Sequence, residues 1–381
     1  MKNLIVLTIG IALTSCASLP HRRDPLDFRA IDAHAQRLVD RESVNGMAFA
    51  IIEGGNVVHV ATFGYRNVKE GRPLTTDTIM YGASLTKTAF AYMLLQLVDE
   101  GRLDLDTSVA ELLPRPLPEY EDYSDLAGDD RWRALTPRIL LAHTSGFANF
   151  RWLEPDKRLR FHFQPGTRYA YSGEGFYILQ LVLEQGLGLD VGKEMQTRVF
   201  DRFKMPNTSM MWRPAFAENL ADGYKLDGSM EPHDERSSVS AAGSMDTTIA
   251  DQAHLWAGIM RGEGLSNASR AEIVRAQVPI ESLHQFPSLA AEIEPANTQI
   301  GLAAGLGLVT FKDPSGPAWF KGGHNDSTGN MVVGLETGKR CIVLLSNDVR
   351  AERLFPEMTK VVLGETKMPW IWEYEWVNTA H

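Results

Sequence analysis

The sequence predicts an α/β protein of the α+β type. In the predicted fold, segments from both ends of the chain form one mostly antiparallel sheet flanked by helices, with a largely helical lobe inserted between them. Two observations favour this fold: β-rich segments gather at both ends, and the middle shows helical periodicity with long irregular connections. The chain has 381 residues, of which 44% are hydrophobic, so it is long enough to bury a large core.

The N-terminal part of the sheet is predicted from a helix followed by a hairpin. The helix spans residues 27–41, and the two strands span 47–53 and 57–63. The sequence Gly54-Gly55-Asn56 forms the turn between the strands, because these residues tolerate the positive φ angles of tight turns.

The C-terminal part supplies the remaining strands and a closing helix. Strands are predicted at 307–310, 318–321, 330–335 and 341–346, a turn at 337–339, and a helix at 351–363.

The helical lobe is predicted over roughly 85–300, with helical periodicity at 85–101, 138–142 and 175–186. We take residues 27–365 as one domain and 366–381 as a C-terminal tail. A ligand cleft is expected where the sheet and the lobe meet.

The N-terminus predicts export. Residues 1–3 form a short, positively charged segment. The apolar stretch at 4–13 that follows is too short to span a bilayer. The following Leu13-Thr14-Ser15-Cys16 resembles a bacterial lipobox. That resemblance implies a signal peptide over 1–16, a lipid on Cys16, a tether over 17–26 and a lipid-anchored place in the cell envelope, at the outer membrane or periplasm if the cell is Gram-negative. An ordinary secretory peptide with an incidental cysteine is the alternative.

Charge and composition exclude some partners. The formal net charge is −10, and an acidic surface repels phosphate backbones, so no nucleic-acid partner is expected. The ten histidines contain no His-x-x-x-His pattern. We therefore expect no metal and no organic cofactor. Cys341 lies in an apolar run and is expected to be a buried thiol without chemistry.

The first candidate motif is Ser84-Leu85-Thr86-Lys87, at the start of a predicted helix. Three residues make almost one helical turn, so the Ser84 hydroxyl and the Lys87 amine share one face. A serine needs a neighbouring base to become a nucleophile, and a buried lysine can be that base when it is neutral. The alternative is a serine that caps the helix beside a surface lysine.

The second motif contains Tyr171 and Gly173, which follow a turn and precede a predicted helix. A tyrosine hydroxyl beside two lysine ammonium groups gives up its proton more readily, so Tyr171 is a candidate general base. The alternative is an aromatic side chain that only packs.

The third motif is Lys321-Gly322-Gly323-His324, at the end of a predicted strand. Gly322 and Gly323 would let the backbone approach a bound substrate closely, and Lys321 would attract a substrate carboxylate. The backbone N–H groups of His324 and Ser84 are the candidate oxyanion hole. The alternative is a simple glycine turn.

The order of these three motifs resembles the serine β-lactamase and penicillin-binding-protein superfamily. The segments 140–146 and 241–251 resemble its class C-related branch, which includes esterases and D-amino-acid peptidases. The resemblance covers roughly residues 28–350 and implies the β-lactamase/transpeptidase-like fold.

The resemblance also implies a role for each matching residue. Ser84 is the acylated nucleophile and Lys87 its partner, Tyr171 relays the proton, and Lys321 anchors or polarises. His143, in the 140–146 segment, is interpreted as structural.

Two positions depart from the family pattern and one keeps it. Gly173 replaces an asparagine that contacts the substrate amide, and Gly322 replaces a threonine that contacts a substrate carboxylate. The first change favours ester cleavage, whereas Lys321, often histidine in esterase relatives, favours a β-lactam or D-peptide.

The predicted function is that of a serine hydrolase acting on a small-molecule or peptide ester or amide. The alternative is a non-catalytic lipoprotein of the same fold that binds peptidoglycan peptides or a partner protein.

Overall fold

The two ends of the chain build one sheet in the computed structural model, which describes residues 25–374. The sheet has nine strands in the order β3-β2-β1-β13-β12-β11-β10-β9-β8, and all neighbours are antiparallel. Strand β1 pairs with β13, with Met47 opposite Ser346, so the N-terminal hairpin joins the C-terminal strands at the centre of the sheet. The strands of this sheet are β1 (Gly46–Glu53), β2 (Asn56–Asn67), β3 (Arg72–Pro73), β8 (Val278–Pro279), β9 (Ala303–Ala304), β10 (Val309–Asp313), β11 (Gly316–His324), β12 (Gly329–Leu335) and β13 (Arg340–Ser346).

The predicted strands are present, and their boundaries differ from the prediction by a few residues. Residues 307–310 were expected to be extended, but Gly307 has a φ of +77° and lies in a turn, so the strand starts at Val309. The short outer strands β8 and β9 were not predicted, because two residues carry no periodicity.

Helices cover both faces of the sheet, which is why β1, β12 and β13 are buried at almost every position rather than at alternate positions. Helices α1 and α10 lie on one face and α7 on the other, with α2 between the sheet and the lobe. In α1, the buried side chains Ile31, Ala35, Leu38 and Val39 recur at helical spacing. The bounds are α1 (Phe28–Arg41), α2 (Leu85–Asp99), α7 (Ile249–Arg261), α8 (Asn267–Ile273), α9 (Pro295–Gln299), α10 (Phe355–Leu363) and α11 (Trp370–Glu373).

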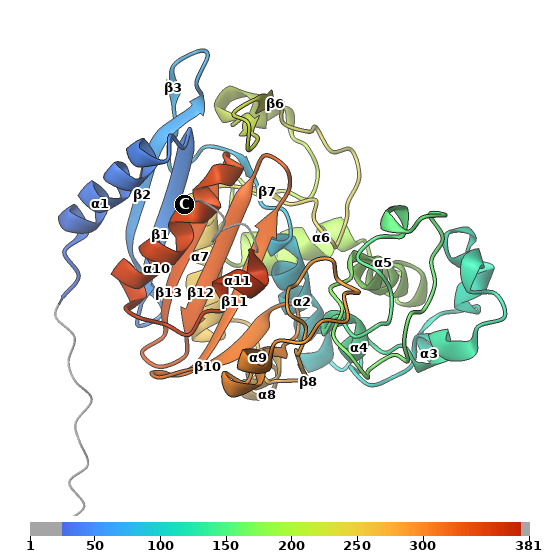
Figure 1. Ribbon diagram of the computed structural model, residues 1–381. Helices are drawn as coiled ribbons and strands as arrows, with labels where there is room; N and C mark the ends of the chain where they lie inside the picture. The colour runs from blue at the N-terminus through green and yellow to red at the C-terminus, as the bar shows by residue number, and fades with distance from the viewer. Residues whose placement is uncertain (1–24, 375–381) are drawn as a thin grey trace, which may run out of the picture.

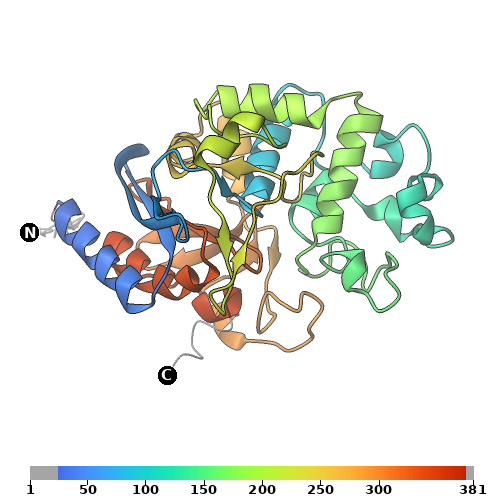
Figure 2. The ribbon, with the colours of Figure 1, turned by 90° about the horizontal axis from the view of Figure 1, so that it is seen from above.

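The helical lobe stands beside the sheet, and Figure 2 shows it from above as a separate group of green helices. It contains short helices joined by long connections. Its helices are α3 (Val109–Leu112), α4 (Pro137–Leu141), α5 (Gly173–Leu181) and α6 (Val191–Met195). Two short two-stranded sheets complete the middle of the chain: β4 (Met80–Tyr81) with β7 (Asp246–Thr247), and β5 (Gly223–Tyr224) with β6 (Met230–Glu231).

The predicted helix at 351–363 is divided in two. A 3₁₀ segment covers Val349–Leu354, and the α-helix α10 begins at Phe355. Pro356 lies in the first turn of α10, where its missing N–H costs nothing and its fixed φ suits a helix start. The proline therefore sets the point where the α-helix begins.

The C-terminal segment does not lie apart from the domain, as the predicted tail at 366–381 implied. Residues 370–373 form α11, and Trp372, Glu373 and Tyr374 are buried. The Trp372 indole packs on Tyr169 and Phe320 and donates a hydrogen bond to Ser282 Oγ at 3.2 Å. The folded domain therefore extends at least to residue 374, because these aromatic side chains are buried against it.

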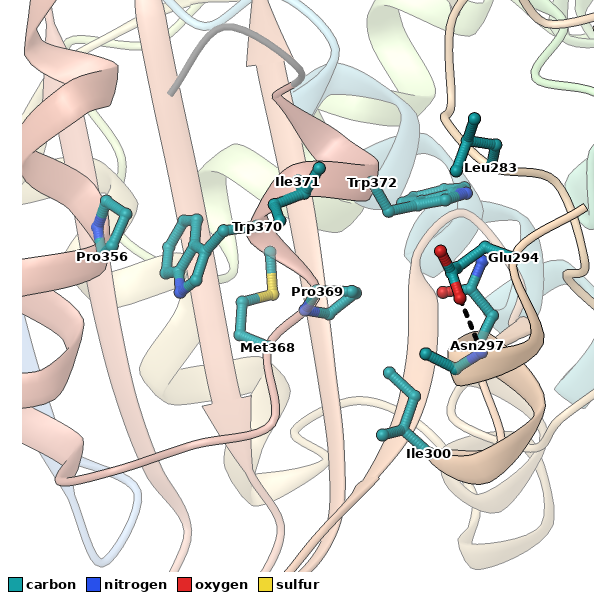
Figure 3. Close-up of a pocket in the computed structure, with 11 residues that line it drawn as sticks. Leu283, Glu294, Asn297, Ile300, Pro356, Met368, Pro369, Trp370, Ile371 and Trp372 are labelled. Carbon is teal, nitrogen blue, oxygen red and sulfur yellow. Dashed lines mark hydrogen bonds between the residues drawn. The ribbon is translucent and has the colours of Figure 1, made fainter. Parts of the chain in front are cut away.

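An apolar hollow of about 480 Å³ lies beside α11 (Figure 3). Trp372 points towards Leu283 and Glu294 on one side, and Trp370 lies near Pro356 on the other. None of the predicted site residues lines this hollow. Over residues 25–374, each helix is too short or too polar to cross a bilayer.

We expect Trp372→Ala to lower the free energy of unfolding by about 3–5 kcal/mol, the usual cost of removing a buried tryptophan. Trp372 is 3% exposed, whereas its neighbour Ile371 is 50% exposed, so Ile371→Ala should cost much less. Urea unfolding of both variants measures the difference. Equal losses would show that α11 does not pack as described.

Candidate active site

Ser84 lies at the N-terminus of α2, directly before the first helical residue. Its side chain does not cap the helix; its Oγ accepts a hydrogen bond from Lys87 Nζ at 3.1 Å. The preceding Ala83 has a φ of +46°, a region that residues with a side chain seldom adopt. This turn presents the Ser84 hydroxyl at the helix end instead of folding it back onto the helix.

Lys87 is buried and not a surface lysine. Its Nζ donates a second hydrogen bond to the Ala242 carbonyl at 2.6 Å, and its side chain is 1% exposed. Burial lowers the pKa of Lys87, and the positive charge of Lys321 lowers it further, while Tyr171 opposes the shift. A lower pKa increases the neutral fraction, which is the form that can accept a proton from Ser84.

Tyr171 lies between the two lysines. Lys321 Nζ donates to Tyr171 Oη at 3.1 Å and to the Gly322 carbonyl at 2.8 Å. Lys87 Nζ and Lys321 Nζ lie 5.0 Å and 4.9 Å from the centre of the Tyr171 ring. Burial lowers the pKa of Lys321 to about 8, although the Glu373 carboxylate opposes this. The structure thus brings all four predicted catalytic side chains together.

The His143 ring packs against the Tyr171 ring. The two rings stack with centres 4.2 Å apart, and His143 Nδ1 accepts a hydrogen bond from the Ser172 N–H at 3.0 Å. Burial lowers the pKa of His143 well below its usual range, and both lysines add to this. A neutral, enclosed imidazole with an occupied nitrogen agrees with the structural role expected for it.

Strand β11 passes beside the first turn of α2. A Cβ atom on Gly323 would lie 3.0 Å from Ser84 N and 2.9 Å from Leu85 N, so only glycine permits this approach. The Ser84 N–H donates to no atom of the described residues. On this strand, Gly323 and Lys321 face the site, while Gly322 faces the opposite side.

His324 follows Gly323 at the end of β11 and lines the cleft. Its Nδ1 lies 3.2 Å from Glu352 Oε1. Burial alone would lower the pKa of His324, but Glu352 and Glu373 outweigh this and raise it. The His324 side chain is thus directed at these buried carboxylates, and only its backbone is a candidate for the oxyanion hole.

Both glycines that depart from the family pattern are contacted by side chains that the sequence analysis did not identify. A Cβ on Gly173 would lie 2.2 Å from the Phe150 ring, and a Cβ on Gly322 would lie 1.8 Å from Glu373 Oε1. Phe150 follows the 140–146 segment, and Glu373 lies in the predicted tail. The apolar Trp370-Ile371-Trp372 was the available signal that the tail packs against the domain.

The cleft beside Ser84 has a volume of about 530 Å³. One wall is aromatic, with Phe150 and Trp152 stacked at 4.1 Å and Tyr177 close to Phe150. Polar residues also line the cleft. The lining residues are Tyr81, Ala83, Ser84, Phe150, Trp152, Tyr177, Asp234, Glu235, Arg236, Ser237, Ser238, Ser240, Ala242, Gly243, Ser244, His324 and Asn325.

Three further points concern Cys341, metal ions and Cys16. Cys341 is a buried free thiol, as expected. Within residues 25–374, no group of three or more His, Cys, Asp or Glu side chains is arranged to hold a metal ion. Cys16, the predicted lipidation site, lies outside the described residues.

The close approach of β11 to α2 can be tested by adding one methyl group at position 323. We expect Gly323→Ala to slow covalent labelling of Ser84 by a fluorophosphonate about tenfold or more, because the methyl meets backbone nitrogens that cannot move aside. Gly175→Ala is the matched control, since its methyl would lie 3.5 Å from its nearest neighbours. Labelling of Gly323→Ala at the rate of the unmodified protein would contradict the geometry.

Comparison with known proteins identifies the family. A family model described as Beta-lactamase matches residues 31–364. The chain is 26% identical over 214 residues to penicillin-binding protein 4* of Bacillus subtilis (strain 168), covering 50% of this chain and 44% of that protein. It is 27% identical over 221 residues to lovastatin esterase of Penicillium rubens, covering 50% of this chain and 54% of that protein. The chain therefore spans about half the length of these curated relatives.

The fold is also shared with solved structures. D-alanine carboxypeptidase AmpC from Burkholderia cenocepacia superposes with a TM-score of 0.68 at 19% identity, over 88% of this chain and 98% of that one. Similarity at this level of identity concerns the fold alone. The family model covers most of the chain, and it agrees with the resemblance carried by the three motifs: this chain belongs to the Beta-lactamase family.

Proposed function

We propose that this protein is a serine hydrolase that cleaves esters through a covalent acyl-enzyme on Ser84. The observation that carries the proposal is the pair of contacts at the cleft: Lys87 Nζ to Ser84 Oγ at 3.1 Å and Lys321 Nζ to Tyr171 Oη at 3.1 Å. Each hydroxyl has its own buried lysine, the arrangement that an activated nucleophile and a proton relay require.

Acylation begins with attack of Ser84 Oγ on the ester carbonyl carbon, while the Oγ proton passes to the neutral amine of Lys87. The carbonyl oxygen becomes an oxyanion, which the N–H groups of Ser84 and His324 stabilise. The bond to the alcohol then breaks. The alcohol leaves with the Tyr171 proton, and Lys87 restores that proton to Tyr171.

Deacylation reverses these proton transfers. A water molecule attacks the acyl carbon and gives a proton to Tyr171, which passes its own proton to Lys87. When the intermediate collapses, Ser84 Oγ recovers the proton from Lys87 and the acid is released. Lys321 remains protonated and holds Tyr171 in place throughout.

The contact between Gly173 and Phe150 favours esters over amides. The aromatic ring fills the space that a side chain at 173 would need, and a phenyl ring cannot replace the hydrogen bonds of an asparagine amide. Recognition of a substrate amide at this wall is therefore lost, while an ester needs no such partner.

We expect the chain without residues 1–16 to hydrolyse a p-nitrophenyl short-chain ester and to leave a chromogenic cephalosporin intact. Ser84→Ala should reduce ester turnover at least about 10³-fold, because it removes the nucleophile. Steady-state rates and the mass added to Ser84 by a fluorophosphonate provide the measurement. Cephalosporin turnover would overturn the ester assignment, and absence of both turnover and added mass would favour a non-catalytic binding protein.

We also propose that the mature protein is held in the bacterial cell envelope by a lipid on Cys16. In a bacterial host fed a labelled fatty acid, the protein should take up the label, and Cys16→Ser should abolish this. A processed but unlabelled protein would instead indicate an ordinary secretory peptide.

A further inference from the structure

We propose that Trp152, which stacks on Phe150 at the wall of the catalytic cleft, is a specificity-determining residue that makes the site prefer esters with a flat aromatic ring. This inference rests on the proposed ester hydrolysis and adds the class of ester. Phe150, Trp152 and Tyr177 line the same cleft of about 530 Å³ as Ser84. A substrate ring bound at this wall therefore lies in the cleft that contains the nucleophile.

The indole of Trp152 is more exposed than is usual for a tryptophan. It is 53% exposed, whereas tryptophan side chains are on average highly buried. Phe150 covers one face of the indole, because the two rings lie with their centres 4.1 Å apart and their planes only 9° apart. The second face of the indole is therefore available to a flat group that enters the cleft.

The Phe150 ring gives Trp152 a rigid support. A Cβ on Gly173 would lie 2.2 Å from Phe150 Cε1, so the ring is packed directly against the backbone at the start of α5. Tyr177 lies one turn further along this helix, with its ring centre 5.9 Å from that of Phe150. Phe150 is thus held between backbone and a second ring, and it keeps the indole stacked on it in one orientation.

The backbone that carries the two rings is tied to the start of the same helix. The buried Glu174 carboxylate accepts hydrogen bonds from the Arg151 backbone N–H at 2.8 Å and from Arg151 Nη2 at 2.6 Å. The Gly173 N–H donates to the Asn149 carbonyl at 2.8 Å. These bonds hold both rings against the segment that carries Tyr171, so the wall keeps its position relative to the proton relay.

The Tyr81 ring also lines the cleft, but its face is already covered. The guanidinium group of Arg236 lies 3.8 Å from the centre of that ring. Arg236 is held in turn by Asp246, with Nη1 2.7 Å from Oδ1. Tyr81 therefore has its stacking partner within the protein, whereas Trp152 combines a rigid support with a face open to a ligand.

A flat ring gains more from such a surface than a puckered ring of the same size. Stacking brings the whole face of each aromatic ring into contact, and it contributes beyond the burial of apolar area alone. A cyclohexyl ring is as apolar as a phenyl ring, but it is not planar. The wall should therefore distinguish two esters that differ only in this ring.

Two matched pairs of esters test the inference, with acid release by the chain without residues 1–16 followed at constant pH. Ethyl 3-phenylpropanoate and ethyl 3-cyclohexylpropanoate carry the ring in the acyl group, and 2-phenylethyl acetate and 2-cyclohexylethyl acetate carry it in the alcohol. We expect kcat/KM to be about three- to tenfold higher for the phenyl ester in at least one pair. That pair identifies the side of the scissile bond that faces Trp152.

Trp152→Ala should remove this preference, and Trp152→Phe should keep part of it. Because Trp152 is more than half exposed, both variants should fold, which urea unfolding checks. Leu153→Ala is the control, since Leu153 belongs to the same short helical segment and is 63% exposed but does not line the cleft. It should leave the preference unchanged.

The inference is overturned if the unmodified protein prefers the phenyl ester in neither pair, or if Trp152→Ala keeps the preference. Failure of the proposed function gives a different result. None of the four esters would then be hydrolysed, and Ser84 would take up no fluorophosphonate.

Discussion

The close approach of β11 to the first turn of α2 is the constraint on which the rest of the site depends. Gly323 permits it, because any larger residue would meet the backbone nitrogens of Ser84 and Leu85. This approach brings Lys321, from the C-terminal part of the chain, to Tyr171 in the helical lobe. Ser84, Tyr171 and Lys321 thus come from three separate parts of the chain and meet at the junction between the sheet and the lobe.

Burial of two lysines near one tyrosine is costly for folding, and the structure offsets only part of that cost. Lys87 reaches the Ala242 carbonyl and Ser84 Oγ, and Lys321 reaches the Gly322 carbonyl and Tyr171 Oη. Neither lysine makes an ion pair within 4.0 Å among the described residues. The remaining cost appears as lowered pKa values of both lysines, and at Lys87 this favours the neutral amine that a proton acceptor must be.

Local patterns predicted the central strands and the principal motif residues, because strand alternation and the Ser-x-x-Lys spacing depend on neighbours in sequence. The parts that could not be predicted depend on distant contacts. Gly307 was placed in a strand, but its positive φ is visible only in the folded turn. Gly173 and Gly322 were read as lost substrate contacts. The sequence did not reveal that Phe150 and Glu373 fill those two places, because each partner is remote from its glycine along the chain.

The C-terminal segment links the packing of the fold to the strand that carries Lys321. The apolar Trp372 side chain is buried, and its packing on Tyr169 and Phe320 holds α11 against the sheet. The next residue, Glu373, is thereby directed at Gly322 on β11, the strand that also carries Lys321 and Gly323. An apolar contact whose immediate effect is to stabilise the fold therefore also fixes the position of a buried carboxyl group against β11. A change in the packing of this segment would alter the electrostatics of the site without touching any of the three motifs.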